Sequence, residues 1–348
     1  MPYLAAVAPS DVCHLIAHSR AWVQSRDTTV PILISVCIAN WNCREVLRAC
    51  LESLLDYPQG VRLEVVVVDN ASTDGTADMV ARDFPEVDLV RNGENRGFAK
   101  ASNQAAARAK GRYILFLNND TVVPPNTLAR LADFARRHPE AGMIGPRLRD
   151  ADGKYQISYR RKPSVAALLH RTALLRWTGL FGRAYREYRR GGFDPHHEGP
   201  VDLLMGAAVL MPRGLFRDGN HWDEDFAFGG EDLELAARVG RRYPVLFAPS
   251  VEITHYGRVS SRLNVGFSTE SVAIGYVHYL RKTGTSRAAV RFYKLAVTLD
   301  APLQLIGKLS QYLGRSVIGR HEKAKKSLLA AKGLAHFVFR SLPKFWRA

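Results

Sequence analysis

The chain has 348 residues, of which 47% are hydrophobic and 24% are charged, a composition typical of a globular protein with a real core. No run of 18 apolar residues is present, which argues against a membrane-spanning helix. The net charge is +16, and residues 281–348 hold 15 Lys and Arg against two acids, a net of +13. This basic end indicates an anionic partner, either a phosphorylated substrate, an acidic membrane surface or nucleic acid.

Residues 1–30 are weakly patterned and form an extension to which the sequence assigns no role. Asp11, His14 and His18 interrupt its apolar stretch, so it makes a poor signal peptide. Because no Cys-x-x-Cys pair is present, we expect reduced thiols in a cytoplasmic protein. The cysteines are Cys13, Cys37, Cys43 and Cys50.

Apolar strands alternate with helices through residue 120, at a spacing of about 30 residues that is typical of a doubly wound parallel sheet. Each strand is short and rich in β-branched residues, whereas each helix shows apolar side chains three and four positions apart. The predicted strands are 32–39, 63–68, 88–91 and 114–117, and the predicted helices are 44–55, 76–83 and 98–109.

Polar side chains follow these strands where each one ends. Asn118, Asn119 and Asp120 come directly after the four apolar residues 114–117. Because the carboxyl ends of parallel strands meet at one edge, where open α/β sheets bind ligands, this edge is the predicted site. The alternative is ordinary loop polarity. The other polar strand ends are Asn40 with Asn42, and Asp69 with Asn70.

After residue 120 the regular alternation stops. A helix is predicted at 127–137, and strands at 142–146 and 244–256. Residues 158–190 contain nine Lys and Arg against one acid and are predicted to be a mobile basic insertion. Residues 202–211 are strand-like, with small residues at 206–208 that allow a ligand to approach the backbone closely.

A second polar cluster follows the pair Gly229-Gly230, where Glu231 and Asp232 open a predicted helix. Acids at that position often only complement the helix dipole. Here apolar Phe228 and Leu233 flank them, and carboxylates beside apolar walls have a raised pKa that suits proton abstraction. His255 ends the last strand; a lone histidine is more often structural than a ligand.

These stretches resemble the inverting family-two glycosyltransferases of the GT-A fold. Residues 35–42, 68–76, 95–99 and 117–120 are similar to the nucleotide-sugar half, and residues 206–208, 228–234 and His255 to the acceptor half. The similarity runs from about residue 32 to 261 and is closest to rhamnosyltransferases that extend lipid-linked glycans. It implies an α/β, Rossmann-like, mostly parallel doubly wound sheet over 31–265, divided into 31–121 and 122–265. A basic, amphipathic helical extension would cover 266–348.

The resemblance also implies residue roles. Asp232 would be the catalytic base, with Glu231 supporting it, and Asp120 with His255 would hold Mg²⁺ or Mn²⁺. Asn118 stands where the family's metal motif has its first aspartate, so the metal would have one fewer negative ligand. The acceptor side would include Gly206, Ala207 and Trp222. Donor binding would fall to Ala39, Asn42, Asp69, Asn70, Asn95, Arg96, Gly97, Asn118 and Asn119.

The expected reaction moves one sugar, rhamnose being a candidate, from a dTDP or UDP sugar to a hydroxyl of a glycan or polyprenyl-diphosphate-linked acceptor in cell-surface polysaccharide synthesis. Apolar residues at helical spacing in 303–317 and 334–346, edged by Lys and Arg, suit an interfacial helix on an anionic membrane. The alternative for both stretches is a packing helix with a solvated basic face. We therefore expect a cytoplasmic protein that is peripheral at the inner face of the cell membrane.

Three other hypotheses of function were weighed against a single-sugar glycosyltransferase. The net charge fits a nucleic-acid-binding protein, although no zinc or helix-turn-helix signature is present and no nucleic-acid partner is expected. A processive polysaccharide synthase would carry Gln-x-x-Arg-Trp, but residues 173–177 read Ala-Leu-Leu-Arg-Trp. A nucleotide-binding module without catalysis is disfavoured because Asp232 and His255 occur together. The sequence leaves open the donor sugar, the nucleotide base, the acceptor and the oligomeric state.

Overall fold

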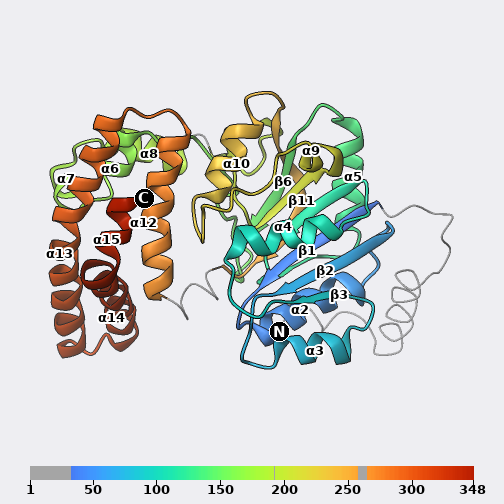
Figure 1. Ribbon diagram of the computed structural model, residues 1–348, viewed down its shortest axis with the longest axis horizontal. Helices are drawn as coiled ribbons and strands as arrows, with labels where there is room; N and C mark the ends of the chain where they lie inside the picture. The colour runs from blue at the N-terminus through green and yellow to red at the C-terminus, as the bar shows by residue number, and fades with distance from the viewer. Residues whose placement is uncertain (1–32, 192, 258–264) are drawn as a thin grey trace.

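A computed structural model describes residues 33–191, 193–257 and 265–348, and the extension 1–30 and Cys13 lie outside this range. Nine of the described strands form one sheet whose main path runs β3-β2-β1-β4-β10-β6-β11-β5, with β8 paired to β11. Helices cover both faces of the sheet, and a group of further helices stands at one end of it (Figure 1).

The first half of the sheet is parallel and follows the sequence prediction closely. Its core strands pair in parallel, and the register places Asn40 opposite Asp69 at the carboxyl edge. The small differences lie at strand ends. The elements are β1 (Ile34–Asn40), α2 (Arg44–Leu55), β2 (Leu63–Asp69), α3 (Thr76–Asp83), β3 (Asp88–Arg91), α4 (Phe98–Arg108) and β4 (Tyr113–Leu117).

The second half of the sheet is mixed, because β10 (Ala208–Pro212) runs antiparallel to both β4 and β6 (Met143–Arg149). β6 and β11 (Val245–His255) are parallel, and β5 (Thr121–Val122) pairs antiparallel with the end of β11. The remaining elements here are α5 (Thr127–Arg137), β8 (Gly199–Pro200), α9 (Arg213–Arg217) and α10 (Glu231–Val239).

The predicted strand 202–211 is divided in two. β9 (Leu203–Leu204) pairs with β7 (Tyr159–Arg160) in a separate two-stranded sheet, whereas β10 joins the main sheet. Residues 205–207 lie between them, so the small residues sit at a break in the strand. This break exposes backbone beside the carboxyl end of β4, where Asn118 N donates to Ala207 O at 2.9 Å.

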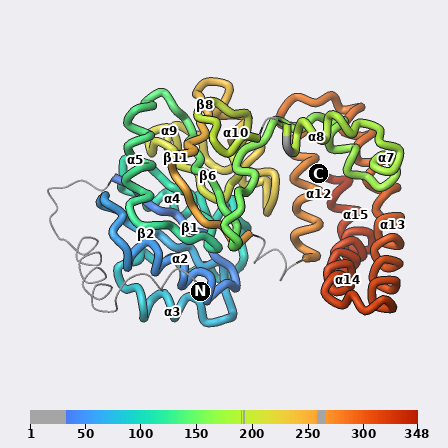
Figure 2. Tube along the Cα trace, turned by 180° about the vertical axis from the view of Figure 1, so that it is seen from behind, coloured from blue at the N-terminus to red at the C-terminus, as the bar shows by residue number. Residues whose placement is uncertain are grey.

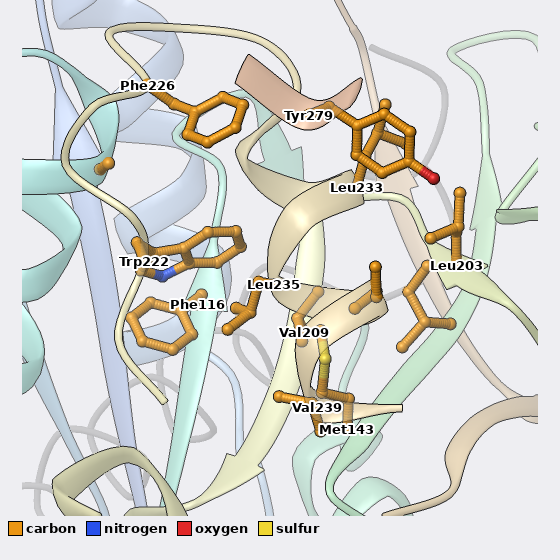
Figure 3. Close-up of a cluster of buried hydrophobic side chains, with 14 of the residues drawn as sticks. Phe116, Met143, Leu203, Val209, Trp222, Phe226, Leu233, Leu235, Val239 and Tyr279 are labelled. Atoms are coloured by element: carbon orange, nitrogen blue, oxygen red, sulfur yellow. The ribbon is translucent and has the colours of Figure 1, made fainter. Parts of the chain in front are cut away.

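Alternate side chains of each central strand enter different cores, as a sheet covered on both faces requires. Val36 and Leu115 pack in the cluster that includes α2 and α5, whereas Cys37 and Phe116 pack on the side of α4 and α10. The second cluster extends across α10 to Tyr279 of the C-terminal helices (Figure 3). Cys37, Cys43 and Cys50 are buried and form no disulfide among the described residues, in agreement with the predicted thiols.

The remaining helices form a separate group beside the sheet, with α13 farthest from it (Figures 1 and 2). Within the residues described, no helix is long and apolar enough to cross a membrane. The group comprises α6 (Val165–Leu169), α7 (Ala173–Thr178), α8 (Gly182–Arg190), α12 (Val265–Lys282), α13 (Arg287–Val317), α14 (His321–His336), the π-helical turn η1 (Phe337–Ser341) and α15 (Leu342–Arg347).

The basic insertion contains the helices α6, α7 and α8, which the sequence did not predict, and its mobility stays a prediction. Leu168 and Leu169 of α6 are buried, and Ala173 N donates to Asp300 Oδ1 of α13 at 2.7 Å. Apolar contacts therefore connect this stretch to the C-terminal helices. The two predicted apolar stripes also differ from each other. Phe337 and Phe345 of the second stripe are buried in helix packing, whereas the first stripe, in α13, is exposed.

Candidate active site

A cavity of about 260 Å³ opens at the carboxyl ends of β1 and β4, the edge predicted from the sequence. Polar side chains form its floor, and aromatic rings form one wall, where Phe267 of α12 lies 6.2 Å from Trp41 and 6.5 Å from Phe228, centroid to centroid. The predicted residues that line it are Ala39, Asn70, Asn95, Gly97, Asn118, Asn119, Asp120 and His255.

Amide side chains fix the shape of this edge by bonding to one another. Asn119 Nδ2 donates to Asn40 Oδ1 at 2.6 Å. Asn70 Nδ2 donates to Asn95 Oδ1 at 3.0 Å and to Gly97 O at 3.1 Å. Buried amide groups need hydrogen-bond partners, and here they bond to one another. These bonds connect the three strand ends into one pre-formed polar rim.

Three predicted donor-binding residues lie behind that rim instead of lining the cavity. The Asp69 carboxylate is buried and accepts from Ser72 N at 3.0 Å. Asn42 Oδ1 accepts from Thr73 N at 2.8 Å, and Arg96 N donates to Asn70 Oδ1 at 3.1 Å while its side chain is exposed. Their roles in donor binding stay predictions, and the contacts shown are those that order the neighbouring loops.

Asp120 and His255 meet at one side of the cavity. Asp120 Oδ1 lies 3.3 Å from His255 Nε2, and the Asp120 side chain is almost fully buried. Pairing of β5 with β11 sets His255 opposite Thr121, and Tyr256 N donates to Asp120 O at 2.9 Å. Two residues 135 positions apart are therefore placed by backbone hydrogen bonds.

Gln156 determines which nitrogen of His255 carries its proton. The amide nitrogen of Gln156 donates to the main-chain oxygen of His255 at 2.6 Å, so its Oε1 faces His255 Nδ1 at 3.0 Å. An amide oxygen only accepts, so Nδ1 must donate to it. In the neutral ring, Nε2 then directs its lone pair toward the Asp120 carboxylate.

Either a proton on Nε2 or a metal ion between the two groups satisfies a lone pair that faces a carboxylate oxygen, and Asn118 Nδ2 also lies 3.5 Å from Nε2. The pair fits a divalent metal, because a histidine that binds a metal usually donates its other N–H to an oxygen acceptor. Among the residues described, no group of three His, Cys, Asp or Glu side chains could hold a metal. Asp120 and His255 would supply two ligands, the Asn118 amide could supply a third, and bound diphosphate oxygens would complete the shell. The imidazole nitrogen favours Mn²⁺ over Mg²⁺, which takes oxygen ligands.

The predicted catalytic acids follow a turn that α12 holds in place. Gly229 and Gly230 have φ of 83° and 103°, a region that favours glycine. A Cβ built on Gly275 of α12 would lie 1.9 Å from Gly229 O, so only glycine allows this approach. The C-terminal helices thus fix the backbone that presents Glu231 and Asp232. The sequence around Gly229 and the sequence around Gly275 gave no indication of this contact.

Asp232 lies between the rim and a second cavity. A Cβ built on Gly206 would come 3.2 Å from Asp232 Cβ, and Gly206 is next to Ala207, whose oxygen accepts from Asn118 N. Asp232 does not itself line the first cavity. Burial raises the pKa of the Asp232 carboxyl, and the charge of Arg160 partly offsets this increase.

Glu231 is more deeply buried than Asp232, and its Oε2 has no hydrogen-bond partner among the described residues. Burial, followed by the charge of Asp232, raises the pKa of Glu231 to about 8. At neutral pH, Glu231 therefore holds a proton that the unfolded chain releases. A protonated Glu231 adds no second negative charge beside Asp232.

Replacing Glu231 with Gln should therefore change how stability depends on pH. Between pH 4.5 and 8 the native state binds a proton that the unfolded state has lost, so this group makes the free energy of unfolding fall as pH rises, by up to about 1.4 kcal/mol per pH unit. Thermal unfolding from pH 4.5 to 8 should show a gain in Tm for Glu231→Gln that grows with pH. The exposed Glu322→Gln is the control; equal pH slopes in wild type and Glu231→Gln would contradict the assignment.

Trp222 corrects the acceptor-side prediction. Its side chain is only 1% exposed and packs against Phe98 and Phe116 at centroid distances of 5.5 and 5.1 Å (Figure 3). Asn103 holds its main chain, with Nδ2 donating to Trp222 O at 2.8 Å. Trp222 is therefore a core residue that carries the loop leading to Gly229, while Gly206 and Ala207 lie beside Asp232 and Asn118.

Comparison with known proteins identifies a domain in the first part of the described chain. Residues 35–198, slightly less than half of the chain, match the family model described as Glycosyl transferase family 2. These residues carry a family 2 glycosyltransferase domain. The N-acetylglucosaminyl-diphospho-decaprenol L-rhamnosyltransferase of Mycobacterium tuberculosis is 30% identical over 208 residues, which cover 56% of this chain and 66% of that protein, just under two thirds.

Two further proteins resemble this chain. Poly-beta-1,6-N-acetyl-D-glucosamine synthase of Staphylococcus epidermidis is 23% identical over 201 residues, covering 55% of this chain and 42% of that protein. The crystal structure of GalNAc-T7 with UDP, GalNAc and Mn²⁺ has a TM-score of 0.52 and 18% identity, covering 72% of this chain and 48% of the other. This similarity concerns the fold, and the predicted GT-A-like α/β sheet with a helical C-terminal region is confirmed.

Several features of the family 2 site were missed from sequence alone. Gln156 lies in a loop without a recognisable pattern, and its role appears only through its two bonds to His255. Trp41 and Phe228 belong to stretches that were identified, but the cavity wall also needs Phe267, from a region predicted only as a basic extension. The contact between Trp41 and Phe267 joins parts of the chain more than 200 residues apart.

Proposed function

We propose that this glycosyltransferase moves one sugar, with inversion, from a nucleoside-diphosphate sugar to a hydroxyl of a glycan or lipid-linked acceptor. The observation that carries the proposal is the Asp120–His255 pair, 3.3 Å apart on the rim of a pre-formed cavity. Asp232 lies close behind that rim, through Gly206 and the bond from Asn118 to Ala207. One side of the rim would hold the leaving diphosphate, and the other would receive the acceptor proton.

The chain's residues would act on the donor by binding and orienting it. The amide rim of Asn70, Asn95 and Asn119 offers fixed donors and acceptors to the nucleoside and diphosphate, while the ring of Phe267 covers the cavity and limits water. Asp120 and His255 would hold Mn²⁺ or Mg²⁺, which when bound neutralises the charge that develops on the diphosphate.

Asp232 would take the proton from the attacking hydroxyl. The acceptor oxygen forms a bond to the anomeric carbon as the bond from that carbon to the phosphate oxygen breaks, and the electron pair leaves with the nucleoside diphosphate. Attack on the face opposite the leaving group inverts the anomeric centre. The raised pKa of Asp232 makes its carboxylate a stronger base than an exposed aspartate.

The acceptor would approach from the side of Arg160. Arg160 and Arg161 line a separate cavity of about 460 Å³, and the charge of Arg160 acts on Asp232. Two guanidinium groups suit a diphosphate, the group that the relative from M. tuberculosis carries in the name of its acceptor. We therefore propose a diphosphate-linked glycolipid as acceptor, and a deoxyhexose such as rhamnose as the transferred sugar.

A transfer assay tests this function. The protein is incubated with Mn²⁺, a panel of dTDP and UDP sugars and a short-chain GlcNAc-diphosphate lipid, and the product is analysed by mass spectrometry and by the NMR coupling of its new anomeric proton. The expected product has one added sugar with inverted configuration. A polymer of many sugars would favour the processive alternative, and a retained configuration would contradict the role of Asp232.

The exposed apolar face of the C-terminal helices supports contact with a membrane, the environment of a lipid-linked acceptor. Along α13, large apolar side chains recur every three or four residues and are exposed to solvent: Phe292, Leu295, Leu299, Leu303, Ile306, Leu309, Leu313 and Val317. α7, which contacts α13, adds Leu174 and Trp177, the latter 85% exposed. With the net charge of +13 over residues 281–348, this face suits an anionic bilayer surface. The predicted location at the inner face of the cell membrane stays a prediction.

Placing a charge on this face should weaken membrane binding. Leu303→Glu removes an apolar side chain worth roughly 1.5–3 kcal/mol of burial, so partitioning onto anionic vesicles should fall by roughly 10–100-fold. Gln311→Glu adds the same charge to an exposed position of α13 and should cost only a few-fold. Vesicle flotation measures both, and equal effects of the two variants would mean that α13 contributes charge alone.

A further inference from the structure

A larger cavity, of about 870 Å³, lies within the helical group and has no part in the site described above. It opens between the end of α12 and the start of α13, with Trp346 of α15 on one side. Four cationic side chains line it: Arg281, Arg287, Arg291 and Lys294.

These cations have no Asp or Glu side chain beside them. No acid lines the cavity, and none of the four makes an ion pair among the residues that the structure describes. Arg281 donates to an oxygen of Ala348, the last residue of the sequence given, and Lys294 Nζ donates to Trp346 O at 3.0 Å. The positive charge available to an anion in this cavity therefore lies mainly on the exposed Arg287 and Arg291.

The ammonium group of Lys294 is the most buried of the four charges. The residue is only 5% exposed, and burial, followed by the charge of Arg281, lowers the pKa of its ammonium group. Placing a cation in a protein interior without a counter-charge is unfavourable. The ammonium group donates to Trp346 O and lies 6.0 and 5.8 Å from the ring centroids of Phe345 and Trp346, and a bound anion would add the counter-charge that these contacts lack.

The surroundings of the cavity indicate what kind of anion fits. Phe292 and Leu295 line it and also begin the exposed apolar stripe of α13. A ligand held here would have its negative group among Arg287, Arg291 and Lys294 and an apolar portion along that stripe. A phosphate with acyl chains has this arrangement, whereas a free phosphate would leave the apolar part unused.

The cavity is distinct from the place proposed for the acceptor diphosphate. Gly275, against which the Gly229 turn packs, and Arg281 are six residues apart in α12, which places them about 120° apart around the helix. The turn before Asp232 and this cavity therefore lie on different faces of α12. A ligand here would position the enzyme without touching the reacting sugar.

We propose that the cavity lined by Arg281, Arg287, Arg291 and Lys294 binds the phosphate of an anionic membrane lipid. This proposal rests on the proposed membrane contact of α13 and adds a specific headgroup site to it. The bound lipid would fix the orientation of the enzyme at the membrane surface, so that the apolar stripe enters the bilayer interface and the acceptor side faces it.

Vesicle binding by the full chain tests the proposal. Wild type, Arg287→Ala/Arg291→Ala and the control Arg241→Ala/Arg242→Ala, which removes the same charge from exposed positions next to β11, are floated with phosphatidylcholine vesicles containing 0 or 30% phosphatidylglycerol. The cavity variant should bind phosphatidylglycerol vesicles roughly 30-fold more weakly, since two surface charges are worth about 1 kcal/mol each. The control should stay within a few-fold of wild type.

Lys294→Met adds a readout that a purely structural residue would not give. Without lipid its Tm should rise, because a buried unpaired charge is removed, while binding to phosphatidylglycerol vesicles falls. Equal loss in the cavity and control variants, or a fall in Tm with unchanged vesicle binding, would overturn the headgroup site. So would stabilisation of wild type by inorganic phosphate to the same extent as by phosphatidylglycerol vesicles. Wild type that binds neither vesicle would instead contradict the membrane contact itself.

Discussion

Replacing Asp232 with Asn is expected to lower sugar transfer by roughly 10²–10⁴-fold, the usual contribution of a general base, while nucleotide binding stays unchanged. The substitution keeps the size of the side chain but removes the group that accepts the proton. Because Asp232 does not line the donor cavity, the affinity for a nucleoside diphosphate should be the same as in wild type. Initial rates and a nucleotide titration monitored by thermal shift measure the two properties.

Asp225→Asn is the matched control for this experiment. Asp225 lies on the loop that leads into α10 but is exposed and pairs with Lys282 at 2.7 Å, so its loss should leave the rate nearly unchanged. The pH profile gives a second check, since transfer by wild type should fall as the pH drops below the raised pKa of Asp232. Full turnover by Asp232→Asn would remove this residue from the role of base.

Replacing Asp120 with Ala is expected to reduce transfer by roughly 10³-fold, about 4 kcal/mol, because the carboxylate that would hold the metal is lost. The metal would neutralise the charge of the diphosphate. Unlike Asp232→Asn, this change should also weaken nucleotide binding, and only when Mn²⁺ is present. Titration with and without Mn²⁺, together with Mn²⁺ binding followed by electron paramagnetic resonance, separates the two contributions.

Gln156→Leu tests the proposed metal site without replacing Asp120 or His255. Gln156 donates to His255 O and accepts from Nδ1, so without it the ring is free to take the other tautomer and turn its lone pair away from Asp120. Mn²⁺ affinity should fall by roughly 10–100-fold, the usual effect of losing such a partner. Tight nucleotide binding by Asp120→Ala, unaffected by Mn²⁺, would contradict the metal site.

The parallel half of the sheet could be predicted from sequence because its signals are local. Helix α2 begins and ends at the predicted residues, as its apolar positions follow one helical face. The polar ends of β1 and β4 could be placed on one rim because parallel strands share an edge, and Asn119 does bond to Asn40.

Other parts of the site depend on contacts that no local pattern reveals. The insertion has the charge of a solvated loop, yet Leu168 and Leu169 of α6 are buried and α6 contacts α13. Trp222 stands next to a functional loop in sequence, but its ring completes the core under α10. Gly275 and Gln156 act through single close contacts with residues 46 and 99 positions away.

A crystal structure with Mn²⁺ and a nucleoside diphosphate would test the central claim most directly. The account predicts an anomalous manganese peak between the Asp120 carboxylate and His255 Nε2, with the diphosphate in the cavity bounded by Asn70 and Phe267. The Asp232 carboxylate should then face the open side of that diphosphate. A nucleotide bound elsewhere, such as among Arg287 and Lys294, or a metal far from His255 would contradict it.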